Sequence, residues 1–409
     1  MAIDNKDKKV LKSSIEREQN ELACSAEREK IKGSKNLNVP HLRFPEFSGE
    51  WNKYTINDLA TVVGGGTPDT TVKSYWGGDI QWFTPSEIGK NKYVDFSKRT
   101  ITRDGLDNSS AKLLPLHTIL LSSRATVGEC SIASNECTTN QGFQSLIAKQ
   151  CNIDFLYYLI QTKKKDLIRN ACGSTFLEIS ANEIRKIKVA VPVQNEQEQI
   201  AKLLSLIDER IATQNKIIED LKKLKSAISL NVLHSDKWEQ FKIKDIAQIG
   251  RGRVISSIEI GQQKSPTYPV YSSQTSNDGI MGYLDDYMFE GEYISWTTDG
   301  ANAGTVFYRN GKFNCTNVCG LLKLRKEFDT HFVSLVLAEA TKKYVSINLA
   351  NPKLMNNTMG NIQIRLPKLE EQKRISIVFR VLQRLWTVHN SLLTEYTKQE
   401  QYLLSQMFI

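Results

Sequence analysis

The feature of the sequence that most constrains its fold is an internal repeat. Residues 51–60 read WNKYTINDLA and residues 238–247 read WEQFKIKDIA, so a pattern of aromatic, aliphatic and acidic positions recurs 187 residues later. A second pair, PVQNEQEQI at 192–200 and PKLEEQKRI at 367–375, recurs at a spacing of 175. Because both matches keep the same order, they indicate a tandem duplication. We expect two similar globular units, the second 12 residues shorter.

Weaker matches lie inside the repeat. Residues 139–142 (TNQG) resemble 316–320 (TNVCG), and residues 124–128 (RATVG) resemble 299–304 (DGANAG). Each repeat then ends in a short apolar strand, at 187–191 or 362–366, followed by a proline. Proline cannot donate a hydrogen bond to a sheet, so it suits the end of a strand.

A long stretch without Pro or Gly follows each of these prolines. Apolar residues recur there at alternating steps of three and four, which is typical of a helix with a coiled-coil seam. Gln214, Lys225 and His389 are polar seam positions that could set the register. The two stripes are expected to bury each other in an antiparallel pair. The predicted apolar seam is Leu204, Ile207, Ile211, Ile218 and Leu221 in the first helix and Ile375, Val378, Leu382, Leu385 and Leu392 in the second.

The predicted fold class is mixed α+β (α/β), with two repeated globular domains joined by two long antiparallel, coiled-coil-like helices and related by a pseudo-two-fold. Residues 1–37 are rich in Lys and Glu and poor in aromatics, which predicts a solvated, flexible extension. The expected segments after this extension are a first domain at 38–195, a central helix at 196–236, a second domain at 237–368 and a C-terminal helix at 369–409.

The charge is concentrated in the globular segments. The chain of 409 residues carries +9, with +3 over 41–195 and +4 over 237–368, while the two helical segments are nearly neutral. Basic surfaces favour polyanions, because bound phosphates release their counterions. No apolar run reaches the roughly 18 residues of a membrane span, and no secretory leader is visible, so we expect a cytoplasmic protein without membrane contact.

Catalytic and metal-binding patterns are missing. The seven cysteines are scattered without a C-x-x-C pair, so no metal site is predicted. No phosphate-binding G-x-x-x-x-G-K-[ST] or nucleophile-elbow G-x-S-x-G pattern occurs. Asn351-Pro352-Lys353-Leu354 lacks the second proline and the aromatic residue of the amino-methyltransferase motif. We therefore predict no catalytic residue and no cofactor in this chain.

The glycine-rich pieces of the two units carry a family resemblance. The first unit reads GGTP at 65–68, YWGGDIQW at 75–82 and TPSEI at 84–88, and the second reads YPVYSSQ at 268–274 and DGANAGTV at 299–306. Together with the two strand-Pro-helix junctions, they resemble the target-recognition domains of specificity subunits of type I restriction-modification enzymes. The resemblance covers residues 38–409.

This resemblance implies a mechanism that is divided among several proteins. Each globular domain would read one half of a split site in double-stranded DNA, and the helix pair would act as a ruler between the halves. Two modification subunits would dock on the helices, flip the target adenines out of the stack and methylate them with S-adenosylmethionine. Restriction subunits would translocate and cut unmethylated DNA with ATP and Mg.

Polar and basic loop residues are the candidates for DNA contact, because such side chains reach base edges and phosphates. By contrast, Trp76, Trp82 and Trp296 are expected to anchor the cores. The candidate DNA-binding residues are Thr67, Lys73, Ser86, Arg124, Thr126 and Asn140 in the first unit and Arg251, Arg253, Ser273, Gln274, Asn302 and Asn317 in the second.

Three alternatives remain open on the sequence. The chain could serve another restriction-modification assembly, such as a combined cutting-and-methylating enzyme. It could be a coiled-coil adaptor that binds only protein, although the basic globular segments favour DNA. It could be a methyltransferase, although the methyl-donor and N-P-P motifs are missing. The sequence gives neither the recognised DNA sequence nor the length of its gap.

Overall fold

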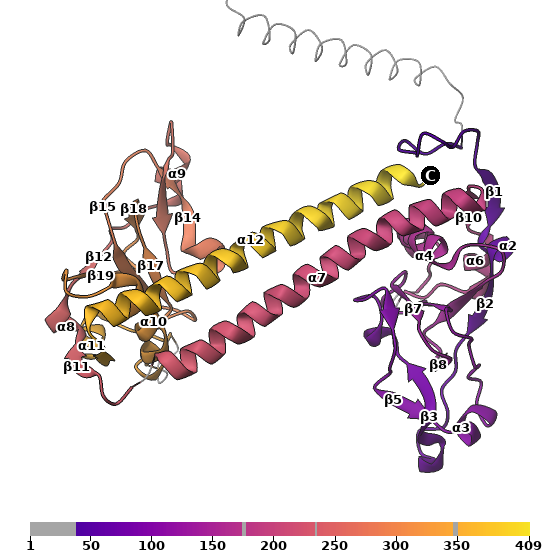
Figure 1. Ribbon diagram of the computed structural model, residues 1–409, viewed down its shortest axis with the longest axis horizontal. Coiled ribbons are helices and arrows are strands. Elements are labelled where there is room, and N and C mark those ends of the chain that lie inside the picture. The colour runs from indigo at the N-terminus through magenta and orange to yellow at the C-terminus, as the bar shows by residue number, and fades with distance from the viewer. Residues whose placement is uncertain (1–37, 174–176, 234, 347–350) are drawn as a thin grey trace, which may run out of the picture. The chain divides into compact units, whose positions relative to one another are not determined.

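The computed structural model describes residues 38–173, 177–233, 235–346 and 351–409 (Figure 1). The predicted extension at 1–37 lies outside these residues. The chain divides into two compact units. Unit 1 contains the described residues up to Thr213 together with Thr394–Ile409, and unit 2 contains Gln214–Leu393.

Unit 1 combines short strands with short helices. Its strands are β1 (Asn52–Thr55), β2 (Ala60–Gly64), β3 (Trp76–Phe83), β4 (Tyr93–Val94), β5 (Arg99–Ile101), β6 (Ile119–Leu121), β7 (Cys130–Ala133), β8 (Cys137–Thr139), β9 (Gln144–Ala148) and β10 (Lys188–Val191). Its helical segments are α2 (Ile56–Leu59), η1 (Lys73–Tyr75), η2 (Pro85–Glu87), α3 (Arg103–Asp107), α4 (Ile153–Thr162), α5 (Lys164–Arg169) and α6 (Ala181–Lys186). The strands form sheets in the orders β2-β9-β6-β7-β4, β5-β3-β8 and β1-β10.

Unit 2 is built in the same way. Its strands are β11 (Glu239–Lys242), β12 (Ala247–Arg251), β13 (Tyr268–Tyr271), β14 (Ile280–Leu284), β15 (Phe289–Glu290), β16 (Tyr293–Thr297), β17 (Val306–Arg309), β18 (Lys312–Cys315), β19 (Cys319–Leu324) and β20 (Gln363–Leu366). Its helical segments are α8 (Ile243–Ile246), α9 (Ser257–Gly261), η3 (Ser276–Gly279), α10 (Thr330–Ala340), η4 (Thr341–Lys343) and α11 (Asn356–Asn361). The sheet orders are β12-β19-β16-β17, β14-β13-β18-β15 and β11-β20.

The sheet topology repeats between the units. The order β2-β9-β6-β7 in unit 1 corresponds to β12-β19-β16-β17 in unit 2. The parallel pair β3–β8 corresponds to β13–β18, and the closing antiparallel pair β1–β10 corresponds to β11–β20. The mixed α+β fold and the duplication are therefore confirmed.

Each unit packs its main sheet against one amphipathic helix. The helix is α4 in unit 1 and α10 in unit 2, and the side chains of Asn152 and Asp329 cap them. The equivalent residues Phe155 and Phe332 are completely buried in the two main cores. Burying an aromatic side chain of this size contributes about 1.5–3 kcal/mol, so each unit has its own source of stability.

Two helices, α7 (Gln194–Val232) and α12 (Leu369–Met407), run through both units. In unit 1, the start of α7 packs on the end of α12, where Leu204 and Leu403 share one core. In unit 2, Gln214 Oε1 lies 2.7 Å from His389 Nδ1, and Lys225 Nζ donates to Gln383 at 3.3 Å. The helices are therefore antiparallel, as predicted.

All five apolar residues of the seam predicted for α7 are buried or half-buried. The seam predicted for α12 is partly wrong. Ile375 and Leu382 are buried, but Val378, Leu385 and Leu392 are 44, 41 and 38% exposed. Ile375 and Leu382 share the inner face with other residues, which lie one position after Val378, Leu385 and Leu392 and continue at steps of seven. These residues are Phe379, Trp386, Leu393, Glu400 and Met407. The reason is that α12 carries aliphatic residues on two adjacent faces, and the bulkier side chains occupy the packed one.

Two further properties of the described residues concern their cysteines and the hydropathy of their helices. Six of the described cysteines are free thiols, and five of these six are buried. None of the described helices is long and apolar enough to cross a membrane.

Candidate nucleic-acid interface

In unit 1, the candidate interface is built on the contact between two loops. The loop after β2 crosses the end of β8, where Gly66 N donates to Thr139 O at 2.8 Å. A Cβ on Gly65 would overlap the carbonyl oxygen of Asn140. Glycine is therefore required here by the close approach of two backbones. The GGTP motif serves this crossing, and it does not form a phosphate-binding turn before a helix.

Side chains extend this contact. The Thr67 hydroxyl donates to Gln141 Oε1, and Asn140 Oδ1 accepts from Gly142 N at 2.9 Å. A Cβ on Gly142 would lie 3.0 Å from the Pro85 ring, next to Ser86. The structure thus brings Thr67, Ser86 and Asn140 together at one loop cluster.

The turn at residues 122–128 joins the same cluster. Ser123 N donates to Gly142 O at 2.8 Å, and the Ser122 and Thr126 hydroxyls lie 2.9 Å apart. Ala125 adopts a φ of 63°, a left-handed conformation that a non-glycine residue rarely takes. The surrounding hydrogen bonds impose this strain, which displays Arg124 and Thr126 at the surface. Strained turns of this kind are common at functional sites.

Lys73 does not join this cluster. It lies in η1, which contacts α3 through hydrogen bonds from Thr102 to the carbonyls of Ser74 and Tyr75. The structure thus brings together five of the six candidates of unit 1, whereas no described hydrogen bond joins Lys73 to this cluster.

Unit 2 repeats the crossing of the two loops. A Cβ on Gly252 would overlap the carbonyl oxygen of Cys315, and Arg253 N donates to that oxygen at 3.1 Å. Thr316 N donates to Tyr271 O in the same way that Asn140 N donates to Phe83 O. Asn140 is therefore equivalent to Thr316, one residue away from the match that the sequence suggested.

The candidates of unit 2 are held by their neighbours. Arg251 Nε donates to Asn356 Oδ1 at 3.0 Å, and Arg253 pairs with Glu259. The Glu259 carboxylate raises the pKa of Arg253, so this guanidinium stays charged. These partners orient both arginines, and the Glu259 carboxylate also offsets part of the positive charge of Arg253.

The remaining polar candidates of unit 2 line adjacent loops. Asn302 Nδ2 donates to the carbonyl of Ser273 at 3.5 Å, and Gln274 Nε2 donates to the carbonyl of Ile280. Asn317 is exposed in the turn between β18 and β19. These side chains surround the turn that corresponds to the Asn140 turn of unit 1.

The tryptophans behave mostly as predicted. Trp82 and Trp296 are buried, and their indole N–H groups donate to the carbonyls of Gly66 and Leu354 at 2.9 Å. Trp76 is half-buried and lies under the guanidinium of Arg99, whose carbon is 3.6 Å from the ring centroid. The sequence does not single out Arg99, which covers the Trp76 ring, or Gln141, which accepts a hydrogen bond from Thr67. Both contacts join residues that are distant in the sequence, and no local motif predicts them.

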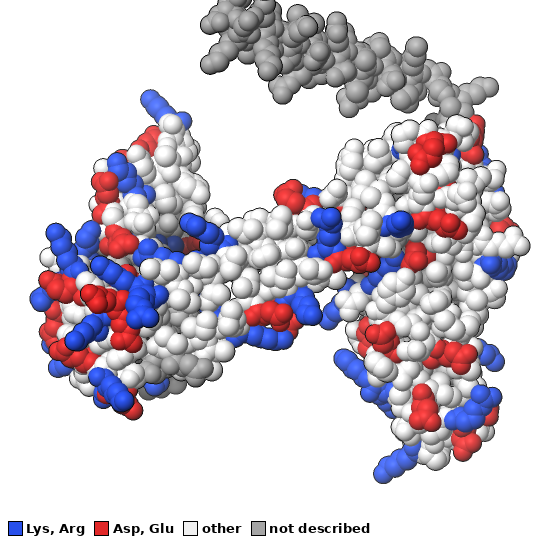
Figure 2. Space-filling view, viewed as in Figure 1, with Lys and Arg blue, Asp and Glu red and all other residues white. Residues whose placement is uncertain are grey.

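Charges of both signs are spread over the surfaces of the two units. Figure 2 shows Lys and Arg interspersed with Asp and Glu on this face, without a continuous basic field. Within the described part of the chain, no group of three or more His, Cys, Asp or Glu residues could hold a metal ion.

Comparison with known proteins connects this arrangement to a family. The type I restriction modification DNA specificity domain matches twice, over residues 48–223 and 235–396. The chain belongs to this specificity family. The two matches cover the two loop clusters and most of α7 and α12, so the family resemblance is confirmed over both units.

Individual relatives agree with this assignment. The specificity subunit of a type I restriction enzyme from Methanocaldococcus jannaschii is 39% identical over 183 residues, covering 43% of this chain and 42% of that subunit. A protein named as a type I specificity subunit in Mycoplasma pneumoniae is 34% identical over 229 residues, covering 53% of this chain and 82% of its own length. The chain thus spans less than half of the first relative.

A solved structure has a fold similar to that of this chain. The crystal structure of the S subunit of a type I restriction-modification system from M. genitalium superposes with a TM-score of 0.66 and covers 91% of this chain and 99% of its own. At 18% identity, this likeness concerns the fold.

Proposed function

We propose that the chain is the DNA-recognition subunit of a type I restriction-modification enzyme. Each unit reads one half of a split site in double-stranded DNA through its loop cluster. The observation that carries this proposal is the repeated loop crossing at Gly65 and Gly252, which presents different side chains in the two units. Because the displayed residues differ, the two half-sites should differ in sequence.

Partner proteins are expected on α12. Val378, Val381, Leu385, Val388 and Leu392 form a second apolar stripe with steps of three and four, and each is 38–52% exposed. We name these five residues the outer stripe. In Figure 2, the middle of α12 shows mostly uncharged surface. Exposed apolar stripes of this kind mark protein interfaces, and they support docking of two modification subunits on the helices.

The chemistry is assigned to the partners. Modification subunits would flip adenines and transfer methyl groups from S-adenosylmethionine, since the adenine amino group is inaccessible inside the stack. Restriction subunits would use ATP and Mg to translocate and cut. The role of the present chain is to bind DNA and position it, without a cofactor of its own.

Mapping of methylated bases in cells that carry the complete system tests this proposal. We expect methylated adenines in a bipartite motif with two different halves and a gap of constant length. A continuous motif, a perfect palindrome or an unmethylated genome would contradict the proposal. Methylation by the purified chain alone would assign the chemistry to this protein and would also contradict it.

A further inference from the structure

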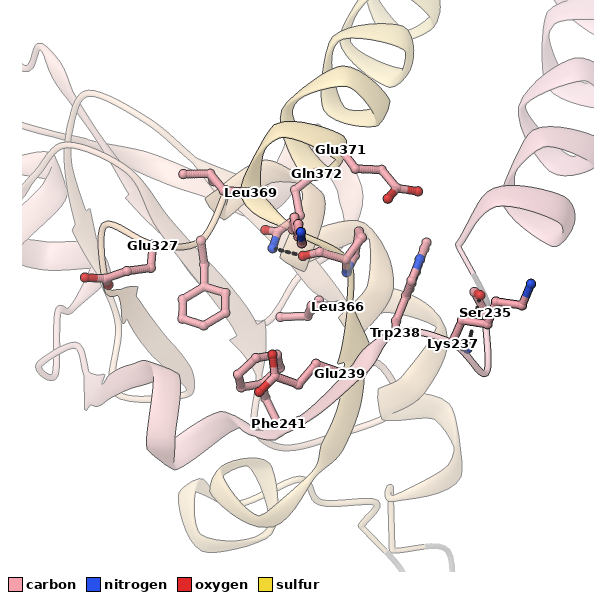
Figure 3. A pocket seen from close by; sticks show the side chains of 13 residues that line it. Ser235, Lys237, Trp238, Glu239, Phe241, Glu327, Leu366, Leu369, Glu371 and Gln372 are labelled. Atoms are coloured by element: carbon pink, nitrogen blue, oxygen red, sulfur yellow. Dashed lines mark hydrogen bonds between the residues drawn. The ribbon is translucent and has the colours of Figure 1, made fainter.

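Unit 2 contains a pocket at the junction between β11, β20 and the start of α12 (Figure 3). Its volume is about 730 Å³. Trp238, Phe328 and Leu366 supply apolar walls, while Glu239, Glu327 and Glu371 supply carboxylates. The pocket thus combines an aromatic surface with negative charge, and both favour a cation.

The equivalent position in unit 1 is filled. There, Glu196 in the first turn of α7 is completely buried and accepts from Arg43 Nε at 2.7 Å and Arg43 Nη2 at 2.8 Å. Trp51 Nε1 donates to the same carboxylate at 3.2 Å. Arg43 also donates to the carbonyls of Gly49 and Ser48, so the loop at 38–50 closes over its own guanidinium.

The two positions are equivalent in detail. Trp51 and Glu196 correspond to Trp238 and Glu371 in the sequence repeat. The next residues, Gln197 and Gln372, make the same two hydrogen bonds. Each donates to the carbonyl of the strand-ending proline, at 3.0 and 2.8 Å, and accepts at 3.0 Å from the backbone N–H of the residue that caps α4 or α10.

What differs is the segment that covers the acid. In unit 2, Trp238 follows α7 after only five residues, 233–237, and none of them is an arginine. No ion pair or side-chain hydrogen bond joins Glu239, Glu327 or Glu371 to another described residue, and all three are exposed. Lys237 and Lys368 also line the pocket, which leaves an excess of one negative charge.

We propose that this pocket binds an arginine side chain presented by a loop of a different protein, and not by a second copy of this chain. The occupied position in unit 1 defines the chemistry of that loop: an arginine next to apolar residues, as in Leu42-Arg43-Phe44-Pro45. A guanidinium pairs with Glu371 through two parallel hydrogen bonds and contacts the Trp238 ring. The lining carries an excess of one negative charge, which disfavours a phosphate group, so we do not assign the pocket to DNA. This proposal does not depend on the proposed function.

A peptide with the sequence of residues 38–50 is a probe for this pocket, because it carries the segment that fills the equivalent position. Binding of the peptide to the full chain is measured by isothermal titration calorimetry. We expect binding that Glu371→Gln weakens about tenfold or more, the loss expected when one charge-assisted pair is removed. Glu370→Gln, which alters an exposed neighbour that does not line the pocket, is the matched control and should leave the affinity unchanged.

The peptide itself supplies a second control, in which its arginine is replaced by glutamine. This peptide should bind the unaltered chain as weakly as the original peptide binds the Glu371→Gln variant. Absence of peptide binding would overturn the proposal. Binding that is insensitive to Glu371→Gln would also overturn it, because the peptide would then be assigned to unit 1. A dimer of the chain that forms without peptide and dissociates in the Glu371→Gln variant would assign the pocket to a second copy and would also overturn it.

Discussion

At the scale of single residues, two carboxyl groups, those of Asp208 and Glu400, meet between α7 and α12 in unit 1. Asp208 accepts from the Tyr158 hydroxyl at 2.5 Å, and Lys92 Nζ donates to that hydroxyl at 3.0 Å. Asp208 also shares a hydrogen bond with Glu400. Burial, with a further contribution from Asp208, raises the pKa of Glu400 from 4.5 to about 7. The pair therefore holds a proton between the helices near neutral pH.

This pair predicts that unit 1 loses stability as the pH rises. Since the folded pKa of Glu400 exceeds the unfolded value, the folded state binds the proton more tightly, and the contribution is lost between about pH 4.5 and 7. Allowing for solvent screening of a partly exposed group, we expect a loss of about 1–2 kcal/mol. Urea unfolding at pH 5 and pH 8 measures it. Glu400→Gln should abolish the difference, whereas Glu395→Gln, on an exposed ion pair with Lys398, should retain it. Equal pH dependence in both variants would contradict this assignment.

Residue-level details were the least predictable from the sequence. Asp208 and Glu400 lie 192 positions apart, and no local pattern pairs them. The register between the units was also misjudged by one residue, because the similar letters of TNQG and TNVCG aligned Thr139 with Thr316 although Asn140 occupies that place. Backbone hydrogen bonds decide this register, and the sequence does not display them. Gly65, by contrast, lies in the GGTP motif at 65–68, whereas no motif predicted from the sequence contains Gly252.

At the scale of elements, the helix pair shows which structural features the spacing of apolar residues can predict. The strand-Pro-helix junctions were predicted correctly, because proline ends a strand by a local effect. The division of each unit into separate sheets was not predicted, since it depends on pairing between distant strands. The inner face of α12 was predicted only in part, because a step of three and then four residues fits two adjacent faces of this helix. Aliphatic Val378 and Leu385 were preferred over Phe379 and Trp386, which are the packed residues.

The two faces of α12 can be separated by experiment. Leu382 is 8% exposed on the inner face and Leu385 is 41% exposed on the outer stripe. Leu382→Ala leaves a cavity and should lower the free energy of unfolding by about 2–3 kcal/mol. Leu385→Ala should change it by less than about 0.5 kcal/mol but weaken assembly with the modification subunits. Chemical denaturation and co-purification measure the two effects. Unchanged co-purification of the Leu385→Ala variant would exclude the outer stripe as the docking surface.

At the scale of the whole molecule, the organisation into two self-contained units matters most. Each unit has its own core and is closed by its own strand pair, with Asn52 opposite Val191 in one and Glu239 opposite Leu366 in the other. The described contacts of each loop cluster stay within one unit, so its geometry does not rely on the other. The pseudo-two-fold relation between the units stays a prediction. Because the contacts of each loop cluster stay within its own unit, the proposed function predicts that the two units read their DNA half-sites independently.

An exchange of one unit tests this independence. Replacing Asn52–Val191 with the matching segment of a relative that recognises another sequence joins the chains where β1 and β10 pair, so both ends of the insert stay together. Arg43, Trp51 and Glu196 lie outside the insert and keep the start of α7 intact. We expect methylated-base mapping to show one changed half-site, while the other half-site and the gap stay the same. Exchanging Glu239–Leu366 should change the opposite half-site. Both exchanges leave α7 and α12 unchanged, and these helices are proposed to set the gap, so the gap should stay constant. A single exchange that changed both half-sites, or the gap, would show that the units do not read DNA independently.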